Sequence, residues 1–239
     1  MNIVKNLVDP SKYSIKCPYA MTAEFIVVHN TYNDAPARNE IAYMISNNNE
    51  TSFHYAVDDK EIVQGIPEDR NAWHASDGGR GNGNRKGIAI EICYSESGGD
   101  RFLAAEKLAA KFIAYKLKEK GWGIDKVKKH QDFASKNCPH RTLALGWDRF
   151  LQMVQAELDA LTPKPSTAQL PMLKQGSKGA SVKALQILLI GNGHSCGSSG
   201  VDGSFGPATY KAVVAYQVAK GLEADGICGP KTWASLLGL

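Results

Sequence analysis

The sequence predicts an α/β domain, with a mixed central sheet flanked by helices, followed by a small three-helix C-terminal domain. Two observations predict this arrangement. In residues 1–161, short apolar runs typical of strands alternate with amphipathic helical patterns. In residues 172–239, one turn-and-helix motif occurs twice. A proline-rich segment separates the two parts, so we expect two domains.

Three runs in the first domain have the composition of strands: 24–29, 53–57 and 88–94. The last is the clearest, because isoleucines at every second position alternate with Ala89, Glu91 and Cys93. The isoleucines are expected to form the core face. Glu91 is therefore expected on the opposite face, beside small residues that leave room around its carboxyl group.

Three segments of the first domain have helical patterns: 36–47, 103–120 and 148–161. Pro36 suits the first turn of one helix, and Gly121 suits the stop after the next. Within 103–120, we expect a buried stripe formed by Leu108, Phe112 and Tyr115. The third helix carries its apolar residues on one side: Phe150, Leu151, Val154, Leu158 and Leu161.

The boundary between the domains is expected at residues 162–171, which hold three prolines among small polar residues. Such a composition favours an extended, semi-rigid linker. A long surface loop inside a single domain is the alternative. We therefore expect one domain over 1–161 and a second over 172–239.

The C-terminal domain contains an internal repeat. Segments 202–210 and 225–233 both read Asp-Gly-x-x-Gly-Pro-x-Thr-aromatic. Each is expected to form a tight Asp-Gly turn, followed by a helix with proline in its first turn. An earlier helix, over 179–190, places Val182, Leu185 and Leu189 on one face. Three short helices then make a small bundle without an obvious catalytic group.

Composition excludes several classes of protein. An apolar content of 43% and a charged content of 22% are ordinary for a soluble globular chain. No apolar run approaches the ~20 residues of a membrane span, and the N-terminus lacks the apolar core of a secretory signal. We therefore expect synthesis in the cytoplasm and no membrane partner. Five cysteines are few and odd in number, so we expect no disulfide framework, although Cys196 and Cys228 could pair.

The net charge of +4 lies in the C-terminal part, where residues 164–239 hold 7 Lys and Arg against 3 Asp and Glu. This excess favours contact with an anionic surface. No basic run with interleaved aromatic residues occurs, so we expect no nucleic-acid partner. We expect the chain to be a monomer.

Three residues of the first domain indicate a zinc site: His29, His130 and Cys138. Imidazole and thiolate are ligands that tetrahedral zinc prefers, and three protein ligands leave the fourth position open, as in catalytic sites. Taken singly, each residue has a plainer interpretation, as a structural histidine, a loop histidine or a small buried hydrophobe. The combination favours a metal hydrolase.

Two further residues are expected to take part in the chemistry. Glu91 is a lone carboxylate that can transfer a proton between water and the leaving amine. Lys136 is close to Cys138 in sequence, where an ammonium group can stabilise a tetrahedral oxyanion. The alternatives are a solvated strand residue for Glu91 and an ordinary surface lysine for Lys136.

A cleft is expected around this site. Trp73 and His74 precede a glycine-rich loop and suit a cleft wall, although an exposed loop is an equal alternative. His54 is expected either to line the cleft or to bond within the core. His140 follows the ligand loop and is expected to anchor it and to contact substrate. The residues expected to bind substrate are Asn30, His54, Trp73, His74 and His140.

These motifs resemble a known family. Segments 27–31, 52–55, 72–75 and 87–91, together with His130-x7-Cys138-Pro-His-Arg, are similar to zinc N-acetylmuramoyl-L-alanine amidases of the type-2 family, which share the fold of T7 lysozyme and peptidoglycan recognition proteins. The C-terminal repeat resembles the peptidoglycan-binding domain 1 family. This combination, without a signal peptide, resembles a phage or prophage endolysin of a Gram-positive host.

The resemblance implies zinc-dependent hydrolysis of the amide between N-acetylmuramic acid and L-alanine in cell-wall peptidoglycan. It assigns the zinc ligands to His29, His130 and Cys138, the acid/base role to Glu91 and the oxyanion role to Lys136. The T7-like branch has a catalytic tyrosine where this chain has Phe53, which strengthens the assignment to Glu91. The alternatives are a non-enzymatic peptidoglycan receptor, a zinc peptidase that cuts between stem residues, and a purely structural binder.

Overall fold

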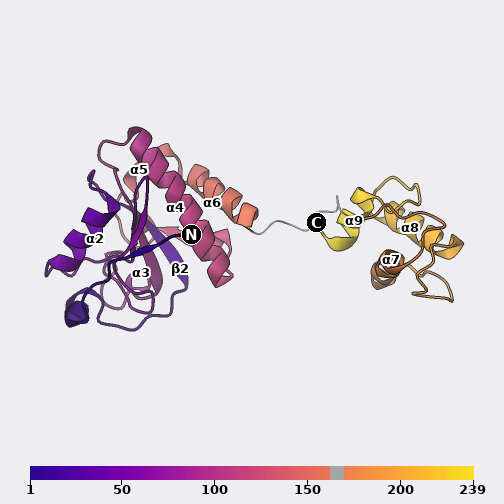
Figure 1. The fold of residues 1–239 in the computed structure, drawn as a ribbon, viewed down its shortest axis with the longest axis horizontal. Helices are drawn as coiled ribbons and strands as arrows, with labels where there is room; N and C mark the ends of the chain where they lie inside the picture. Colours follow the sequence, from indigo (N-terminus) through magenta and orange to yellow (C-terminus); the bar gives the residue numbers. More distant parts are fainter. Residues whose placement is uncertain (162–169) are drawn as a thin grey trace. The chain divides into compact units, whose positions relative to one another are not determined.

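The computed structural model describes residues 1–161 and 170–239 (Figure 1). The chain divides into two compact units, Met1–Thr162 and Pro163–Leu239. Most of the expected linker, residues 162–169, lies outside the described residues. Its last two residues belong to the second unit, because Leu170 packs against that core and the carbonyl of Pro171 accepts a hydrogen bond from the Trp233 indole at 2.9 Å.

The N-terminal unit is built on a six-stranded mixed sheet with the order β1-β4-β3-β5-β2-β6. Its strands are β1 (Val4–Lys5), β2 (Phe25–Asn30), β3 (Tyr55–Val57), β4 (Ile62–Gln64), β5 (Gly87–Ile92) and β6 (Val127–Lys129). Only β3 and β4 pair antiparallel. The three predicted strands are present as β2, β3 and β5. The remaining three span two or three residues each, too few to show a periodic pattern.

Strand β5 lies inside the sheet, between β3 and β2. Its isoleucines are fully buried, as predicted, but Ala89 and Cys93 on the other face are fully buried too. The prediction of one core face was therefore incomplete, because the described layers cover both sides of this strand. Glu91 is the least buried residue of β5, so the layer that covers this face of the strand leaves the Glu91 side chain partly accessible.

Helices cover both faces of the sheet (Figure 1). Helix α2 (Ala37–Ser46) packs against β3 and β4, while α4 (Gly99–Lys120) packs against β5 and β3. Helix α6 (Trp147–Leu161) lies alongside α4. Gly121 ends α4 in the left-handed conformation, at φ 67°, as predicted. Phe112 is buried in α4, but Leu108 and Tyr115 are only partly buried, because Phe102, Ala109, Ile113 and Leu117 form the stripe that meets the core.

Short helical segments complete this unit. They are 3-10 helices at Pro10–Lys12, Ile124–Lys126 and His130–Asp132, and α-helices α1 (Tyr13–Lys16), α3 (Asn82–Lys86) and α5 (His140–Leu145). Among the described residues, none of the helices is both long and apolar enough to span a bilayer.

A buried charge network lies between β3 and α4. Lys116 of α4, with 5% of its side chain exposed, bonds Glu68 at 2.7 Å and Glu119 at 2.9 Å. Lys120 bonds the other oxygen of Glu68 at 2.9 Å, and the Tyr55 hydroxyl donates to Glu68 at 2.7 Å. Glu68 is therefore satisfied by three donors, which lower its pKa to about 2 despite its burial.

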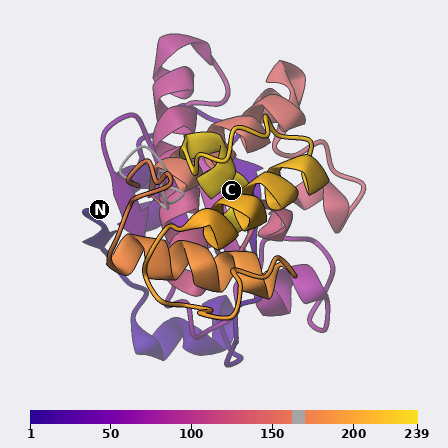
Figure 2. The ribbon, with the colours of Figure 1, turned by 90° about the vertical axis from the view of Figure 1, so that its right-hand side faces the viewer.

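The C-terminal unit has its own core around Val182, Leu185, Val213 and Tyr216. Three helices enclose it: α7 (Ala180–Gly191), α8 (Pro207–Ala219) and α9 (Pro230–Leu237). Figure 2 turns these helices toward the viewer. The prolines stand in the first turns of α8 and α9, as the repeat predicts. Cys196 and Cys228 are both buried free thiols.

Two buried glutamines tie the repeated turns to the preceding helices. The Gln186 amide nitrogen donates to Asp202 at 2.8 Å and to the Thr209 hydroxyl at 3.1 Å, and its oxygen accepts from the Gly203 amide at 2.8 Å. Gln217 makes the same set of bonds to Asp225, Thr232 and Gly226. The repeat is thus a repeat of contacts as well as of sequence.

Candidate metal centre and cleft

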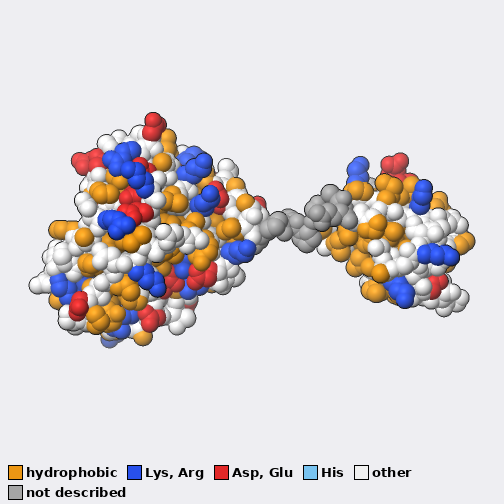
Figure 3. All heavy atoms as spheres, in the orientation of Figure 1, with side chains coloured by type: hydrophobic (Ala, Val, Ile, Leu, Met, Phe, Trp, Pro, Cys, Tyr) orange, Lys and Arg blue, Asp and Glu red, His pale blue; other side chains and the backbone are white. Residues whose placement is uncertain are grey.

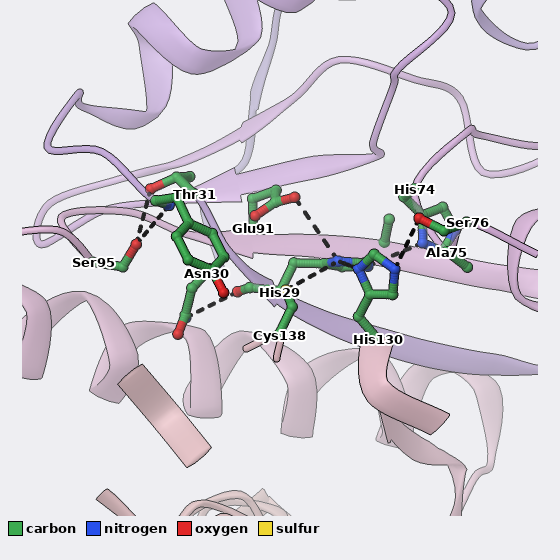
Figure 4. Close-up of polar contacts among 12 residues, drawn as sticks. His29, Asn30, Thr31, His74, Ala75, Ser76, Glu91, Ser95, His130 and Cys138 are labelled. Carbon is green, nitrogen blue, oxygen red and sulfur yellow. Dashed lines mark hydrogen bonds and ion pairs between the residues drawn. The ribbon is translucent and has the colours of Figure 1, made fainter. Parts of the chain in front are cut away.

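Three side chains converge at one edge of the sheet (Figure 4). One donor atom from each of His29, His130 and Cys138 lies within 4.8 Å of the others. The Nδ1 atom of His29 is 3.1 Å from Nδ1 of His130 and 3.7 Å from Sγ of Cys138. All three residues are at most 2% exposed. The structure thus brings together the three residues that the sequence nominates as metal ligands.

The sheet itself delivers the two histidines. Strands β2 and β6 are parallel neighbours, with Val28 opposite Lys129. His29 follows Val28 and His130 follows Lys129, so both imidazoles emerge at the carboxyl end of the sheet, where open α/β sheets bind ligands. Cys138 comes from the loop before α5, and its carbonyl accepts a hydrogen bond from the Gln131 amide at 3.0 Å.

The chemistry of these donors fits a zinc ion. Burial lowers the pKa of His29 well below its ordinary value and that of His130 to about 4, so both imidazoles are neutral at pH 7, as metal ligands must be. Burial raises the pKa of the Cys138 thiol to about 12, but coordination to a cation deprotonates a thiol outright. Two nitrogens and one sulfur form a typical zinc donor set with one open position.

Glu91 faces this cluster from the neighbouring strand. Its Oε1 atom lies 4.0 Å from Nδ1 of His29, and its Oε2 atom is buried without a hydrogen-bond partner among the described residues. Burial raises the pKa of Glu91 to about 8; the nearby Glu40 raises it further and Lys136 lowers it. A carboxyl group in this setting can hold or release a proton near neutral pH.

A cleft runs over these residues in two connected hollows of about 690 Å³ each. Both hollows are lined by Asn30, Thr51, Phe53, Glu91 and Lys136. One extends along α2, past Tyr32 and Tyr43. The other covers His29, His130 and Cys138 and reaches Trp73. Lys136 is an exposed residue whose Nζ lies 5.7 Å from the ring centre of Tyr32. It therefore stands at the junction of the two hollows.

Trp73 and His74 line the cleft. His74 also contacts His29, because its Nδ1 atom lies 3.0 Å from Nε2 of His29.

Asn30 also lines the cleft, but its side-chain oxygen is already hydrogen-bonded within the protein. Its oxygen accepts from the backbone amides of Arg141 and Thr142 at 2.9 and 3.2 Å, which secures the start of α5 beside the Cys138 loop.

Two of the residues expected to bind substrate are not among the described residues that line the cleft. His54 is fully buried; its Nδ1 accepts from the Ala89 amide and its Nε2 donates to the Arg70 carbonyl, both at 3.0 Å. This outcome corresponds to the core alternative. His140 lies behind Tyr32, with ring centres 3.8 Å apart, and its Nε2 donates to the Ser95 carbonyl at 3.1 Å.

The sequence analysis missed several residues of the site. Tyr32, Tyr43 and Glu40 line the hollow along α2, and Ser76 lies 3.2 Å from Nε2 of His130. Tyr32 lies two residues after the end of the strand that carries His29, which is the one local signal that points to it. The other three are common residue types in a helix and a loop, and only the folded chain brings them to the cleft.

Two protein-family models match parts of this chain. The family model for N-acetylmuramoyl-L-alanine amidase matches residues 19–141, and that for a peptidoglycan binding domain matches residues 178–236. The N-acetylmuramoyl-L-alanine amidase CwlA of Bacillus subtilis (strain 168) is 46% identical over 254 aligned positions, which cover 94% of this chain and 93% of CwlA. The amidase XlyB of the same organism is 52% identical over 200 positions, covering 78% of this chain and 63% of XlyB.

Solved structures resemble the N-terminal unit. The structure of PlyL is 55% identical, has a TM-score of 0.63 and covers 64% of this chain and 97% of PlyL. The catalytic domain of XlyA is 35% identical, has a TM-score of 0.59 and covers 64% of this chain and 99% of that domain. These matches confirm the predicted fold class and the predicted resemblance. The chain belongs to the N-acetylmuramoyl-L-alanine amidase family and also contains a region that matches the peptidoglycan binding domain family.

Proposed function

We propose that this amidase hydrolyses the bond between N-acetylmuramic acid and L-alanine in peptidoglycan with a zinc ion held by His29, His130 and Cys138. One observation carries the proposal: the donor atoms of these three residues lie within 4.8 Å of one another at the floor of a cleft. Bound there, zinc supplies Lewis-acid activation of the scissile carbonyl and of water at neutral pH.

Glu91 moves the proton in this proposal. Its Oε2 atom is buried, unpartnered among the described residues and beside the cluster, so it is free to accept a proton from the attacking water. The same atom then returns the proton to the nitrogen of L-alanine as the amide bond breaks. The pKa of about 8 that burial gives Glu91 suits this exchange near neutral pH. Phe53, which also lines the cleft, has no exchangeable proton.

Lys136 stabilises the oxyanion. Among the described residues, it is the one lysine that lines both hollows of the cleft. Its side chain is exposed, and it forms no ion pair with a carboxylate of the described residues. An ammonium group at this place can approach the oxygen on which negative charge develops.

The C-terminal unit binds the cell wall in this proposal. Its described residues include six lysines, against three acidic residues. Two of those acids, Asp202 and Asp225, are held in the repeated turns by glutamines. On the face drawn in Figure 3, lysines are spread over this unit. The unit thus offers positive charge to anionic wall polymers, and tethering it to the amidase raises the local enzyme concentration.

We further propose that the protein is made in the host cytoplasm and acts on the wall after release, in the manner of an endolysin. Peptidoglycan is the partner in this scheme, and neither nucleic acid nor membrane takes part. The oligomeric state that we propose is a monomer.

One digest tests the reaction and its metal dependence. Purified walls are incubated with the full chain, with the chain stripped by a chelator, and with the stripped chain after zinc is restored. We expect peptides that begin with L-alanine, loss of release after stripping and recovery with zinc. Cleavage between stem residues would instead show a peptidase, and no release by a zinc-loaded chain would show a receptor without activity.

A further inference from the structure

The loop of residues 73–76 contacts both histidines of the candidate metal centre (Figure 4). In each histidine, the contacted atom is Nε2, the ring nitrogen that faces away from the shared centre. The Nδ1 atom of His74 lies 3.0 Å from Nε2 of His29. The Ser76 hydroxyl lies 3.2 Å from Nε2 of His130. In both ligands the opposite ring atom, Nδ1, faces the shared centre, and the two Nδ1 atoms are 3.1 Å apart.

We infer that His74 and Ser76 are positioning residues, which fix the tautomer and the ring orientation of the two histidine ligands. The inference rests on the proposed function, because it concerns ligands of the proposed zinc ion. It changes the role predicted for His74, from a substrate contact to a support for His29.

The argument for His74 begins with the proton on His29. A neutral imidazole carries one proton, so if Nδ1 offers its lone pair to a metal, Nε2 carries the hydrogen. That hydrogen requires an acceptor, and Nδ1 of His74 lies at hydrogen-bond distance. His74 must then carry its own proton on Nε2. This atom is buried and has no hydrogen-bond partner among the described residues.

The same reasoning applies to His130. Its Nδ1 atom points toward His29 and Cys138, so its Nε2 carries the hydrogen and the Ser76 hydroxyl oxygen accepts it. Serine at this position has φ +57°, a left-handed conformation that non-glycine residues rarely adopt. Glycine at this position would relieve the backbone strain, but it would also remove the hydroxyl that accepts from His130. The strained serine therefore supports a role for this hydroxyl.

The loop is itself held from behind by two side chains. The Asn84 side-chain oxygen accepts from the backbone amides of His74 and Ala75, both at 2.8 Å, and its nitrogen donates to the Gly78 carbonyl at 3.1 Å. The Asp77 carboxylate accepts from the amides of Gly83 and Asn84 at 2.6 and 3.2 Å. Asn84 is 3% exposed and His74 is 8% exposed. This is a rigid support, in which second-layer contacts orient metal ligands.

Zinc affinity of the full chain tests the inference without depending on turnover. The variants are His74→Phe, which keeps the ring without an acceptor, and His74→Asn, whose side-chain oxygen can accept in place of Nδ1. We expect His74→Phe to lose about 10–100-fold in zinc affinity, measured by competition with a chelating dye. We expect His74→Asn to recover most of that loss. Cobalt(II) bound in place of zinc should show an altered visible spectrum in His74→Phe.

A matched pair of serine variants tests the second contact. Ser76→Ala should weaken zinc affinity, while Ser97→Ala, at an exposed position away from the cluster, should not. The inference is wrong if folded His74→Phe and Ser76→Ala bind zinc as tightly as the unaltered chain, with the same cobalt spectrum. If His74→Phe does not fold, the inference is wrong when Ser76→Ala binds zinc as tightly as the unaltered chain, with the same cobalt spectrum. If the unaltered chain itself binds no zinc, the proposed function fails first.

Discussion

Glu91 and His29 are register partners on two adjacent parallel strands. The pairing of β5 with β2 places the carboxylate 4.0 Å from Nδ1 of the imidazole. The sheet, and not a loop, sets the backbone positions of both residues, so the carboxylate stays near the His29 imidazole as long as these central strands stay paired. A residue on a paired strand is positioned more precisely than one on a loop, which suits a group that must reach a reacting atom.

This geometry predicts that Glu91→Gln retains zinc and loses activity. Glutamine keeps the size of the side chain but cannot accept a proton, and general acid–base catalysis contributes roughly 10²–10⁴-fold. We therefore expect kcat to fall by at least about 10²-fold. Zinc content by elemental analysis should remain near one ion per chain. Near-normal release of amino groups from purified walls would remove Glu91 from the reaction.

Lys136→Ala should lower kcat without unfolding the protein. The side chain is exposed, so its removal exposes no core, and the loss of one oxyanion donor costs about 10²–10³-fold in kcat. Circular dichroism should show an unchanged melting temperature. Lys136→Arg retains the positive charge and should keep more activity than the alanine variant; equal activity in all three proteins would contradict the assignment.

Residues 1–161 alone should fold and hydrolyse walls but bind them less well. Each unit has a separate hydrophobic core, so removal of the second unit exposes no core of the first. Cosedimentation with purified walls compares the truncated and full chains, and activity on a soluble muramoyl peptide serves as the control. Equal sedimentation of both proteins would show that the C-terminal unit is not a wall-binding module.

Gln217→Leu and Gln186→Leu should destabilise the C-terminal unit by similar amounts. Each substitution leaves a buried glycine amide and the Oγ1 of a buried threonine without their main partner, at a cost of about 2–3 kcal/mol. Calorimetry should show a lower melting transition for this unit and an unchanged transition for the amidase unit. Gln175→Leu, at an exposed position of the same unit, is the matched control.

The network around Glu68 predicts an acid-sensitive N-terminal unit. Folding lowers the pKa of Glu68 from its ordinary 4.5 to about 2. Its contribution, about 3 kcal/mol, is therefore fully present above pH 4.5 and is lost as the pH falls toward 2. Glu68→Gln should reduce the free energy of unfolding at pH 6 and flatten its dependence on pH between 5 and 2. Glu119→Gln, whose side chain is 42% exposed, should change the pH dependence of the free energy of unfolding little. The assignment would be contradicted if Glu68→Gln and the unaltered chain showed the same pH dependence.

The sequence by itself determined the elements whose signals are local. The alternation in β5, the glycine that ends α4 and the Asp-Gly and Gly-Pro steps of the repeat all act through neighbouring residues, so they could be predicted without the fold. The nomination of His29, His130 and Cys138 was also possible, because residue type limits the chemistry that a site can perform.

The tertiary structure decided which nominated residues share a site. His54 and His74 belong to similar aromatic segments, yet one bonds two backbone groups in the core and the other lies at hydrogen-bond distance from His29. Strands β1, β4 and β6 have two or three residues each, and they form because neighbouring strands of the sheet pair with them. The physical reason is the same in each case: hydrogen bonds across a sheet and between loops join residues that are distant in the chain, so their partners are set by the packing of the whole unit.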